Sequence, residues 1–369
     1  MSESLWYGDS TAAAVGRAVL APASFLFGAA VGLRSALYDR RLLRVRKAPA
    51  PVISVGALTV GGAGKTPFVL WLVDHLRRSG LEPCVVTRGY FRAESGDSTF
   101  LLGPDCLAEG KDLEHLVRHA GDEAAMMALR TGVAVAVGRD RAEACEEAML
   151  AWSPDLFLLD DGFQHRGLAR DLDIVMVSGE EGRRGLLPAG PLREGPGALA
   201  RAGVVVTTGS DFPAWPRPEG TLATHCRMRP SKLVAAVHDR EGESPSDLRG
   251  RRVVAVAAVA RPGRFLGDLE DCGARVVSKI LRRDHHSWNS ADLREIETAA
   301  AHADLVVTTE KDLVKLGGFA PGSGLLALRT EVDVEQEAAL LERIAALASF
   351  DRSTHRTQYP PTSGGPFSS

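Results

Sequence analysis

Residues 59–67, which read Thr-Val-Gly-Gly-Ala-Gly-Lys-Thr-Pro, have the types and the order of a phosphate-binding loop. Glycines let successive backbone N–H groups approach a phosphate, and the helix that follows turns its positive end toward it. Lys65 would reach the outer phosphates, and the hydroxyl of Thr66 would ligate Mg²⁺. The strict pattern has glycine where Thr59 stands, so we interpret this loop as a variant of that pattern.

The segments on either side of the loop support this interpretation. The apolar run 52–55 predicts a strand before it, and 66–78 predicts a helix after it that stops at Gly80. The alternative is an ordinary glycine-rich turn between a strand and a helix. The predicted nucleotide-binding residues are Thr59, Val60, Gly61, Gly62, Ala63, Gly64, Lys65, Thr66 and Pro67.

The second motif is a pair of carboxylates, Asp160 and Asp161, which directly follow the apolar run 156–159. A carboxylate at the carboxyl end of a strand in this class of sheet faces the phosphate loop and holds Mg²⁺. The alternative is that the two aspartates cap a turn. Gln164 lies three residues further on and adds a polar group at the same edge.

Three smaller clusters have both a structural and a chemical interpretation. Asp122 precedes a predicted helix, where it is an N-cap, a catalytic base or both. The run Asp284-His285-His286 is either a metal pair or a carboxylate-oriented histidine near a reacting hydroxyl. The loop 187–194 ends in the charged residues Arg193 and Glu194, and it is equally well a structural turn.

The elements that must position these residues alternate between strand and helix, which predicts a parallel α/β sheet. We expect a phosphate-loop domain at 48–215 and a smaller α/β domain at 216–350. Before them lies a hydrophobic segment with a basic flank, 1–47, and after them the polar stretch 351–369 predicts a disordered tail. Further predicted strands are 83–87, 133–137, 172–177, 204–207, 253–259, 275–280 and 305–308, and further predicted helices are 139–150, 291–302 and 334–348.

Composition excludes several classes of protein. The 369 residues carry a net charge of −3, which argues against nucleic acid as the main partner. The five cysteines form no C-x-x-C pair, so we expect free thiols in a reducing compartment rather than a disulfide framework or a structural zinc site. Neither the guanine-binding N-K-x-D signature nor the H-R-D and D-F-G motifs of protein kinases occur.

The N-terminal run 18–33 carries no charge and is flanked by arginines. As a helix of 16 residues it would reach about 24 Å, less than the hydrocarbon thickness of about 30 Å. It also makes a poor signal peptide. Two interpretations remain: a buried helix of the domain, or a helix that lies on a membrane surface with basic residues at the headgroups. We favour the second.

Taken in order from about residue 51 to residue 316, these motifs resemble those of the tetraacyldisaccharide 4'-kinase family, the lipid A 4'-kinases. DDGFQH and LPAGPLRE are the most specific of them, and their ordered combination with the others is more specific still. The motifs are VGALTVGGAGKTP at 55–67, TRGY at 87–90, GDE at 121–123, GRDRA at 138–142, DDGFQH at 160–165, LLPAGPLRE at 186–194, ARPGRF at 260–265, DHH at 284–286 and TTEKDLVK at 308–315.

The resemblance implies an enzyme that moves the γ-phosphate of ATP, with Mg²⁺, to the 4'-hydroxyl of a tetraacylated glucosamine disaccharide 1-phosphate. It implies two α/β domains and an N-terminal helix that docks on the inner leaflet, at the cytoplasmic face of the inner membrane, as a peripheral or monotopic protein. Position by position, it makes Asp122 the base and His285 its assistant from the second domain, with Lys65 at the phosphates. Metal and phosphate positions match Thr66, Asp160, Asp161 and Glu194, and cleft-lining positions match Arg141, Gln164 and Arg193.

The sequence departs from the family pattern at a few positions outside this chemistry. The family often has asparagine at Ala57, proline at Ala124 and a residue other than glycine at Gly263, and a phenylalanine commonly precedes DHH where Arg282 and Arg283 stand. These departures concern local packing and acyl-chain contacts. The rival hypothesis is a membrane-associated regulatory ATPase that acts on a protein partner. It explains the phosphate loop and leaves Asp122 and the DHH motif without a role.

Overall fold

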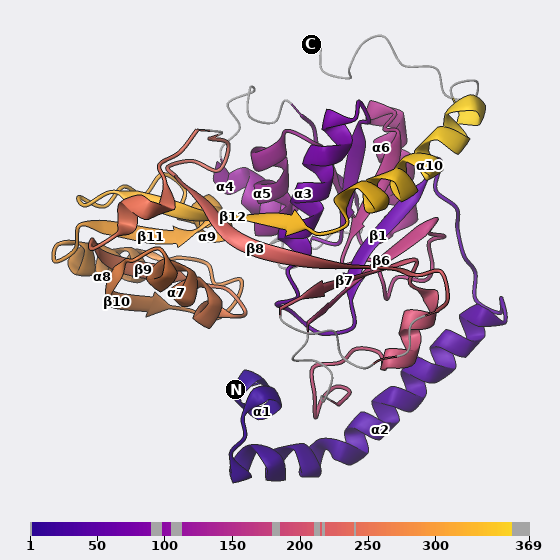
Figure 1. Ribbon diagram of the computed structural model, residues 1–369, viewed down its shortest axis with the longest axis horizontal. Coiled ribbons are helices and arrows are strands. Elements are labelled where there is room, and N and C mark those ends of the chain that lie inside the picture. The colour runs from indigo at the N-terminus through magenta and orange to yellow at the C-terminus, as the bar shows by residue number, and fades with distance from the viewer. Residues whose placement is uncertain are drawn as a thin grey trace. The chain divides into compact units, whose positions relative to one another are not determined.

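The computed structural model describes residues 2–89, 98–104, 113–178, 185–209, 215, 218–239 and 241–355, with side chains described from residue 5 to residue 347 (Figure 1). Its helices are α1 Ser2–Tyr7, α2 Thr11–Asp39, α3 Lys65–Arg78, α4 Leu113–Ala120, α5 Asp122–Thr131, α6 Arg141–Trp152, α7 Pro262–Asp271, α8 Ser290–Ala300, α9 Glu310–Leu316 and α10 Glu337–His355. Its strands are β1 Val52–Ala57, β2 Pro83–Thr87, β3 Phe100–Leu102, β4 Ala134–Val137, β5 Leu156–Asp160, β6 Leu172–Ser178, β7 Val204–Thr208, β8 Leu222–Val234, β9 Arg252–Ala257, β10 Arg275–Leu281, β11 Leu305–Thr309 and β12 Leu325–Val334.

The chain divides into two compact units, each built from separate stretches of sequence. Unit 1 contains Met1–Lys65, Ser153–Arg227 and Val334–Ser369, and unit 2 contains Thr66–Trp152 and Met228–Asp333. This division cuts the chain at other places than 48, 216 and 351, and the domain limits inferred from the sequence remain a prediction. Helix α10 continues to His355, and the rest of the predicted tail lies outside the described residues.

Unit 1 contains a parallel sheet in the order β8-β7-β6-β1-β5. Every residue of β1, β5, β6 and β7 is buried, as expected for strands covered on both faces. Val55 of β1 is in register with Asp160 of β5. The carboxyl end of β5 therefore lies at the edge of the sheet where the phosphate loop leaves β1, and this brings two motifs from distant parts of the sequence together.

Strand β1 depends on a glycine for its contact with the DDGFQH segment. A Cβ built on Gly56 would lie 2.4 Å from Cβ of Phe163 and 2.8 Å from its backbone nitrogen. Phe163 is fully buried, in a cluster with Leu58, Val175 and Leu192. The backbone after β5 therefore packs directly against β1, which holds the two halves of the phosphate site at a fixed spacing.

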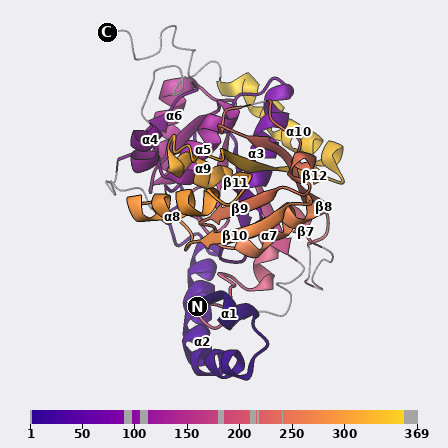
Figure 2. The ribbon, with the colours of Figure 1, turned by 90° about the vertical axis from the view of Figure 1, so that its left-hand side faces the viewer.

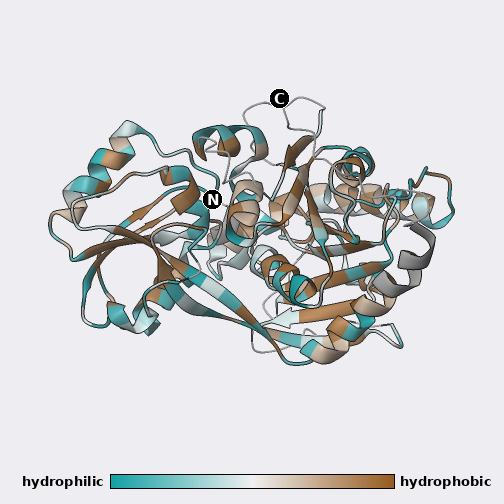
Figure 3. Ribbon diagram, turned by 90° about the horizontal axis from the view of Figure 1, so that it is seen from above, coloured by the Kyte–Doolittle hydropathy of each residue, from teal (hydrophilic) through white to brown (hydrophobic). Residues whose placement is uncertain are grey.

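Unit 2 contains the parallel strands β10-β9-β11-β12 as well as β2 and β4, which pair with each other in parallel while β3 runs antiparallel to β4. Alternate residues of β9 face opposite sides of the sheet. Val253 and Ala255 pack with α7, and Val254 and Val256 pack with α8, so one helix covers each face (Figure 2). The strands of both units consist largely of hydrophobic residues (Figure 3).

The predicted α/β architecture is confirmed, and most predicted elements occur within a few residues of their predicted limits. The main difference is the N-terminal helix, because α2 has 29 residues rather than 16 and includes Pro22. At 1.5 Å per residue it is about 43 Å long, so the length argument against a membrane span was wrong. Among the described residues, one helix, α2, is long and apolar enough to cross a membrane. Length and composition alone are weak evidence of a membrane-spanning helix. The described cysteines, Cys84, Cys145, Cys226 and Cys272, form no disulfide bond.

We predict that Gly56→Ala destabilises the protein by about 1–3 kcal/mol, the usual cost of forcing extra atoms into a packed core. The reason is the 2.4 Å approach of Phe163 to the position of the added methyl group. Urea unfolding followed by tryptophan fluorescence measures the change. Gly267→Ala in α7 is the matched control, since no atom lies within 4 Å of its Cβ position. Equal midpoints for both variants would contradict the prediction.

Candidate active site

The phosphate loop has the backbone conformation that its glycines permit. Gly61, Gly62 and Gly64 have φ values of 70°, 69° and 77°, in the left-handed region that favours glycine. Helix α3 begins at Lys65, directly after them. A helix that begins immediately after such a loop directs unpaired N–H groups toward an anion, so the local structure suits phosphate.

The start of the loop is fixed by the LPAGPLRE segment. Thr59 is fully buried and forms an isolated antiparallel β-bridge with Leu192. The N–H of Val60 donates to the carbonyl of Pro191 at 2.9 Å. Threonine at the place of the usual glycine therefore belongs to the packed base of the loop. The part of the loop that can turn its amides toward a phosphate begins at Gly61.

A charged cluster in unit 1 joins the phosphate loop to the DDGFQH motif. Lys65 Nζ lies 3.3 Å from Asp161 Oδ1, and Arg193 donates to Asp161 Oδ2 at 2.7 Å and to Gln164 Oε1 at 3.3 Å. Burial opposes the charge of Asp161, but Lys65 and Arg193 outweigh it and hold the pKa of this carboxyl below its usual value. Asp161 also has a φ of 53°, a strained conformation for a residue with a side chain.

Two further residues of the metal prediction, Asp160 and Glu194, differ in their surroundings. Asp160 is 3% exposed at the end of β5, whereas Glu194 forms an ion pair with Arg201 at 2.9 Å. Carboxylate and hydroxyl oxygens are the ligands that Mg²⁺ takes in phosphoryl-transfer sites, where substrate phosphates and water complete its shell. Asp160, Asp161 and Thr66 therefore fit Mg²⁺ by donor type. Within the described residues, no group of three or more His, Cys, Asp or Glu side chains could hold a metal without such partners.

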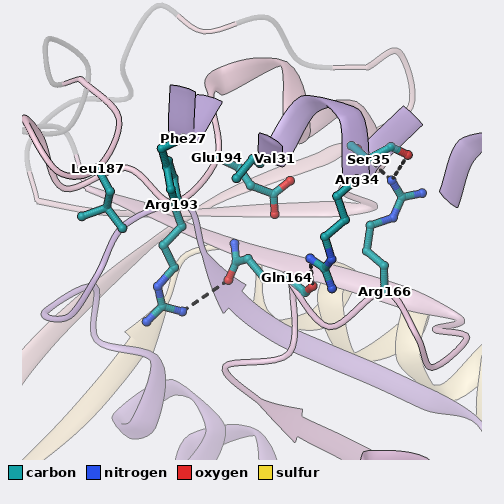
Figure 4. Close-up of a pocket in the computed structure, with 9 residues that line it drawn as sticks. All are labelled: Phe27, Val31, Arg34, Ser35, Gln164, Arg166, Leu187, Arg193 and Glu194. Atoms are coloured by element: carbon teal, nitrogen blue, oxygen red, sulfur yellow. Dashed lines mark hydrogen bonds between the residues drawn. The ribbon is translucent and has the colours of Figure 1, made fainter. Parts of the chain in front are cut away.

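A pocket of about 340 Å³ lies beside this charged cluster, between α2 and the segments that carry Gln164 and Arg193 (Figure 4). Ser24 of α2 donates to the carbonyl of Leu186 at 3.0 Å, and Arg34 donates to the carbonyl of Gln164 at 3.1 Å, so the helix is attached to both motifs. The lining combines apolar and cationic side chains and consists of Phe27, Val31, Arg34, Ser35, Gln164, Arg166, Leu187, Arg193 and Glu194.

A second polar site lies within unit 2, where Asp122 meets His285. Nδ1 of His285 is 3.1 Å from both carboxylate oxygens of Asp122, which is 6% exposed. The two residues are 163 positions apart in the sequence. His285 has a φ of 59°, a strained conformation that its surroundings must hold. Because both residues belong to one compact unit, no movement between the units is needed to join them.

Two lysines of α9 complete this second site. Lys311 Nζ lies 3.8 Å from Asp122 Oδ2 and 3.2 Å from Nε2 of His285, and Lys315 Nζ lies 3.7 Å from the same oxygen of Asp122. Burial opposes the charge of Asp122, but His285 and the two lysines outweigh it and lower its pKa. Burial likewise opposes the charge of Lys311, yet its carboxylate neighbours raise the pKa of the ammonium. The shifts of Asp122 and Lys311 both favour the charged form of the side chain.

The structure corrects the N-cap interpretation of Asp122. The N-cap of α5 is Gly121, with no side-chain cap, and Asp122 is the first residue of the helix. Its Oδ1 accepts from the N–H of Glu123 at 2.9 Å. The carboxylate therefore lies at the positive end of α5, where a negative charge is stabilised, and its oxygens remain near His285.

The two histidines of the DHH motif have different partners. His285 faces Asp122, whereas Nε2 of His286 is 2.7 Å from Asp292, a buried residue that also closes the capping box of α8. This arrangement favours the carboxylate-oriented histidine over the metal pair. His286 supports the backbone that carries its neighbour.

Arg141 and Tyr90 complete the sequence predictions. Arg141 is 3% exposed at the start of α6, and its guanidinium donates to the carbonyl of Gly138 at 3.2 Å, so its described contact is with its own loop. Tyr90 of the TRGY motif lies outside the described residues. Sequence reasoning missed Lys311 and Lys315 as site residues. The signal was the TTEKDLVK run, which was recognised only as part of a pattern.

Known proteins resemble this chain in sequence and in fold. A family model described as tetraacyldisaccharide-1-P 4'-kinase matches residues 16–349. The chain belongs to this family. A tetraacyldisaccharide 4'-kinase of Anaeromyxobacter dehalogenans (strain 2CP-C) is 39% identical over 94% of each chain. One from Koribacter versatilis (strain Ellin345) is 38% identical over 88% of this chain and 97% of that relative.

Among solved structures, the fold is similar to that of an "apo" form of LpxK from Aquifex aeolicus in complex with ATP. The TM-score is 0.73 at 30% identity, over 90% of this chain and 99% of the other. For a member of this kinase family, the two polar sites described above have separate candidate roles, one at the nucleotide phosphates and one at the acceptor hydroxyl.

We predict that the Asp122→Asn variant has a lower free energy of unfolding than the parent protein at neutral pH. This difference in free energy should narrow as the pH falls below 3.8, the usual pKa of an aspartate. Because the pKa is lowered in the folded state, the charge of Asp122 stabilises the fold above that value, and this contribution is lost as the pH falls through the folded pKa. Urea unfolding across a series from about pH 7 to about pH 3 measures it. Asp9→Asn, at an exposed carboxylate, is the control. A difference independent of pH would contradict the prediction.

Proposed function

We propose that this chain transfers the γ-phosphate of ATP to the 4'-hydroxyl of tetraacyldisaccharide 1-phosphate, a step of lipid A biosynthesis. The observation that carries the proposal is that one member of this family contains both a phosphate loop and a buried carboxylate–imidazole pair. A phosphate loop alone is compatible with hydrolysis. A carboxylate held by histidine is what an alcohol acceptor needs.

On the nucleotide side, positioning and charge neutralisation supply most of the catalysis. We assign the loop amides from Gly61 onward to the phosphates and Lys65 to the outer phosphate oxygens. The contact of Lys65 with Asp161 would then hold the ammonium at the end of the loop. Thr66, Asp160 and Asp161 would hold Mg²⁺, with Glu194 next to them. Held by these residues, Mg²⁺ would neutralise charge on the transferring group.

On the acceptor side, we assign Asp122 as the base. Its carboxylate takes the proton of the 4'-hydroxyl as the hydroxyl oxygen bonds to the γ-phosphorus, and the bond from that phosphorus to ADP breaks. A carboxylate with a lowered pKa suffices, because in such a loose transition state the proton is needed late. His285 orients the carboxylate through Nδ1.

For the lipid acceptor, we assign the pocket between α2 and Gln164. Phe27, Val31 and Leu187 provide an apolar wall for an acyl chain. Arg34 and Arg193 provide positive charge and hydrogen-bond donors for the sugar and its phosphate. Such a mixed lining suits a molecule with one polar and one apolar part. Arg141 has no assigned role in this proposal.

The long helix α2 would place this pocket at a membrane surface. Val19, Phe25, Leu26 and Leu33 of α2 are 72%, 76%, 69% and 63% exposed. Such exposed apolar residues together with a basic flank favour a helix that lies in the headgroup region. We infer from this a peripheral or monotopic protein at the cytoplasmic face of the inner membrane. The regulatory ATPase is not favoured, because the family and its relatives are kinases.

We predict that the purified protein transfers labelled phosphate from ATP to the lipid disaccharide, and that Asp122→Ala lowers turnover at least ~10²-fold while ATP still binds. Loss of a general base removes the proton acceptor and leaves the phosphate loop intact. Thin-layer separation of labelled lipid measures transfer, and a fluorescent ATP analogue measures binding. Phosphate release without labelled lipid would overturn the proposed function. Unchanged transfer by Asp122→Ala would overturn the base assignment alone.

We further predict that the double variant Phe25→Ser, Leu26→Ser binds vesicles of anionic phospholipid at least ~10-fold more weakly than the parent. Burying one such side chain contributes about 1.5–3 kcal/mol, and each 1.4 kcal/mol is about tenfold. Vesicle sedimentation measures the bound fraction. Leu150→Ser in α6 is the control, because Leu150 is also 69% exposed but lies on another helix. Equal binding of the double variant and the parent would show that α2 does not carry the protein to the bilayer.

A further inference from the structure

Lys311 lies close to Asp122, to His285 and to two further carboxylates of the Asp122 site. Its Nζ lies 2.9 Å from Asp284 Oδ1, 3.2 Å from Glu123 Oε1 and 3.8 Å from Asp122 Oδ2. The same nitrogen lies 3.2 Å from Nε2 of His285. The lysine side chain is 13% exposed, so it is largely removed from water. A cation that neutralises three carboxylates does not by itself need to reach a ring nitrogen, and this contact requires its own explanation.

The chemistry of the two groups fixes the direction of this hydrogen bond. An ammonium has three donors and no acceptor, so Lys311 must donate and Nε2 of His285 must accept. A neutral imidazole that accepts at one nitrogen carries its proton on the other. Nδ1 is therefore the protonated nitrogen, and it faces the Asp122 carboxylate, which can only accept. The two contacts of the ring are mutually consistent in this tautomer alone.

We infer that Lys311 is a positioning residue for the phosphoryl transfer: its ammonium, bonded to Nε2, holds His285 as the neutral imidazole with the proton on Nδ1. This inference rests on the proposed function, in which Asp122 is the base. In the opposite tautomer, a lone pair of Nδ1 would face the carboxylate and repel it. With a second proton on the ring, an imidazolium would bind the carboxylate and make it a weaker base.

The other charged groups around the ring do not replace Lys311. Asp284 Oδ2 lies 3.7 Å from Nε2, on the side that would favour a protonated ring, but Lys311 bonds to the other oxygen of the same carboxylate. Glu123 is bonded to the same ammonium. Lys315 lies near Asp122, but its Nζ bonds to Asp312 at 2.8 Å and to the carbonyl of His286 at 3.1 Å. Lys311 is therefore the cation that separates the ring from the outer carboxylates.

Helix α9 is fixed firmly enough to hold Lys311 in place. Glu310 accepts from Arg130 of α5 at 2.7 Å and from Arg329 of β12 at 2.7 Å, and all three side chains are at most 10% exposed. At the start of the helix, the Thr309 hydroxyl accepts from the N–H of Asp312 at 3.1 Å. Through Glu310, α9 is thus joined to α5, the helix that carries Asp122.

Nitrogen-15 NMR of the full-length protein at neutral pH tests the inference directly. His285→Gln identifies the His285 signals by their loss. In the parent protein we expect Nδ1 protonated and Nε2 unprotonated. A parent spectrum with the proton on Nε2, or with both nitrogens protonated, would overturn the inference without any change to Lys311. This reading does not depend on activity, and so it is separate from the proposed function.

Lys311→Met is the variant that removes the donor, and Lys315→Met is its matched control. For Lys311→Met we expect Nε2 of His285 to become protonated, kcat to fall at least about tenfold, KM for ATP to stay within about twofold, and the acid limb of kcat to move to higher pH. Lys315→Met should retain the parent signals of His285. Urea unfolding shows whether each variant is folded.

The outcomes separate the two hypotheses. If the parent transfers phosphate to lipid but both lysine variants leave the His285 signals unchanged, the role of Lys311 is wrong and the proposed function stands. Equal changes in both variants would mean that general loss of positive charge, and not the Nε2 contact, controls the ring. If the parent forms no labelled lipid while the expected signals appear, the proposed function fails and the tautomer assignment stands.

Discussion

The second site depends on keeping the Asp122 charge in a place where burial opposes it. The carboxylate lies at the positive end of α5, with His285 Nδ1 at 3.1 Å and two ammonium groups within 4 Å. A buried charge without such partners would take up a proton or destabilise the fold. Helices α5 and α9 and the DHH loop must therefore come together for the Asp122 carboxylate to stay charged. The Glu310 ion pairs and the strained backbone at His285 follow from the same requirement.

The charged cluster around Asp161, in the other unit, has a comparable balance of charges. Lys65 and Arg193 hold Asp161 charged, and Arg193 also contacts Gln164. The LPAGPLRE segment supplies Arg193, buries Thr59 and attaches to α2 through Ser24. One segment thus contacts the phosphate loop, the DDGFQH motif and the N-terminal helix. A run that looks like a simple turn in the sequence therefore connects three parts of unit 1.

Several features could be predicted from sequence because their cause is local. The glycines of the phosphate loop have the positive φ values that their residue type permits, and uninterrupted apolar runs such as 52–55 and 204–207 became buried parallel strands. Helix lengths were predicted less well. Helix α2 extends beyond its apolar run at both ends. Ser10 caps its start, and Arg34 and Ser35 near its end contact the segment 164–166. The N-cap assignment of Asp122 failed because Gly121 takes that position.

By itself, the sequence determined the fold class, the phosphate loop, the family and the residues that match its motifs. These follow from residue type, from order along the chain and from patterns that repeat within a few residues. Only the tertiary structure decided which partners those residues have. It paired His285 with Asp122 and His286 with Asp292, and it brought Lys311 to the far side of the His285 ring. The reason is that hydrogen bonds and ion pairs act over a few ångströms between groups far apart in the chain, such as Lys311 and Glu123, which are 188 residues apart.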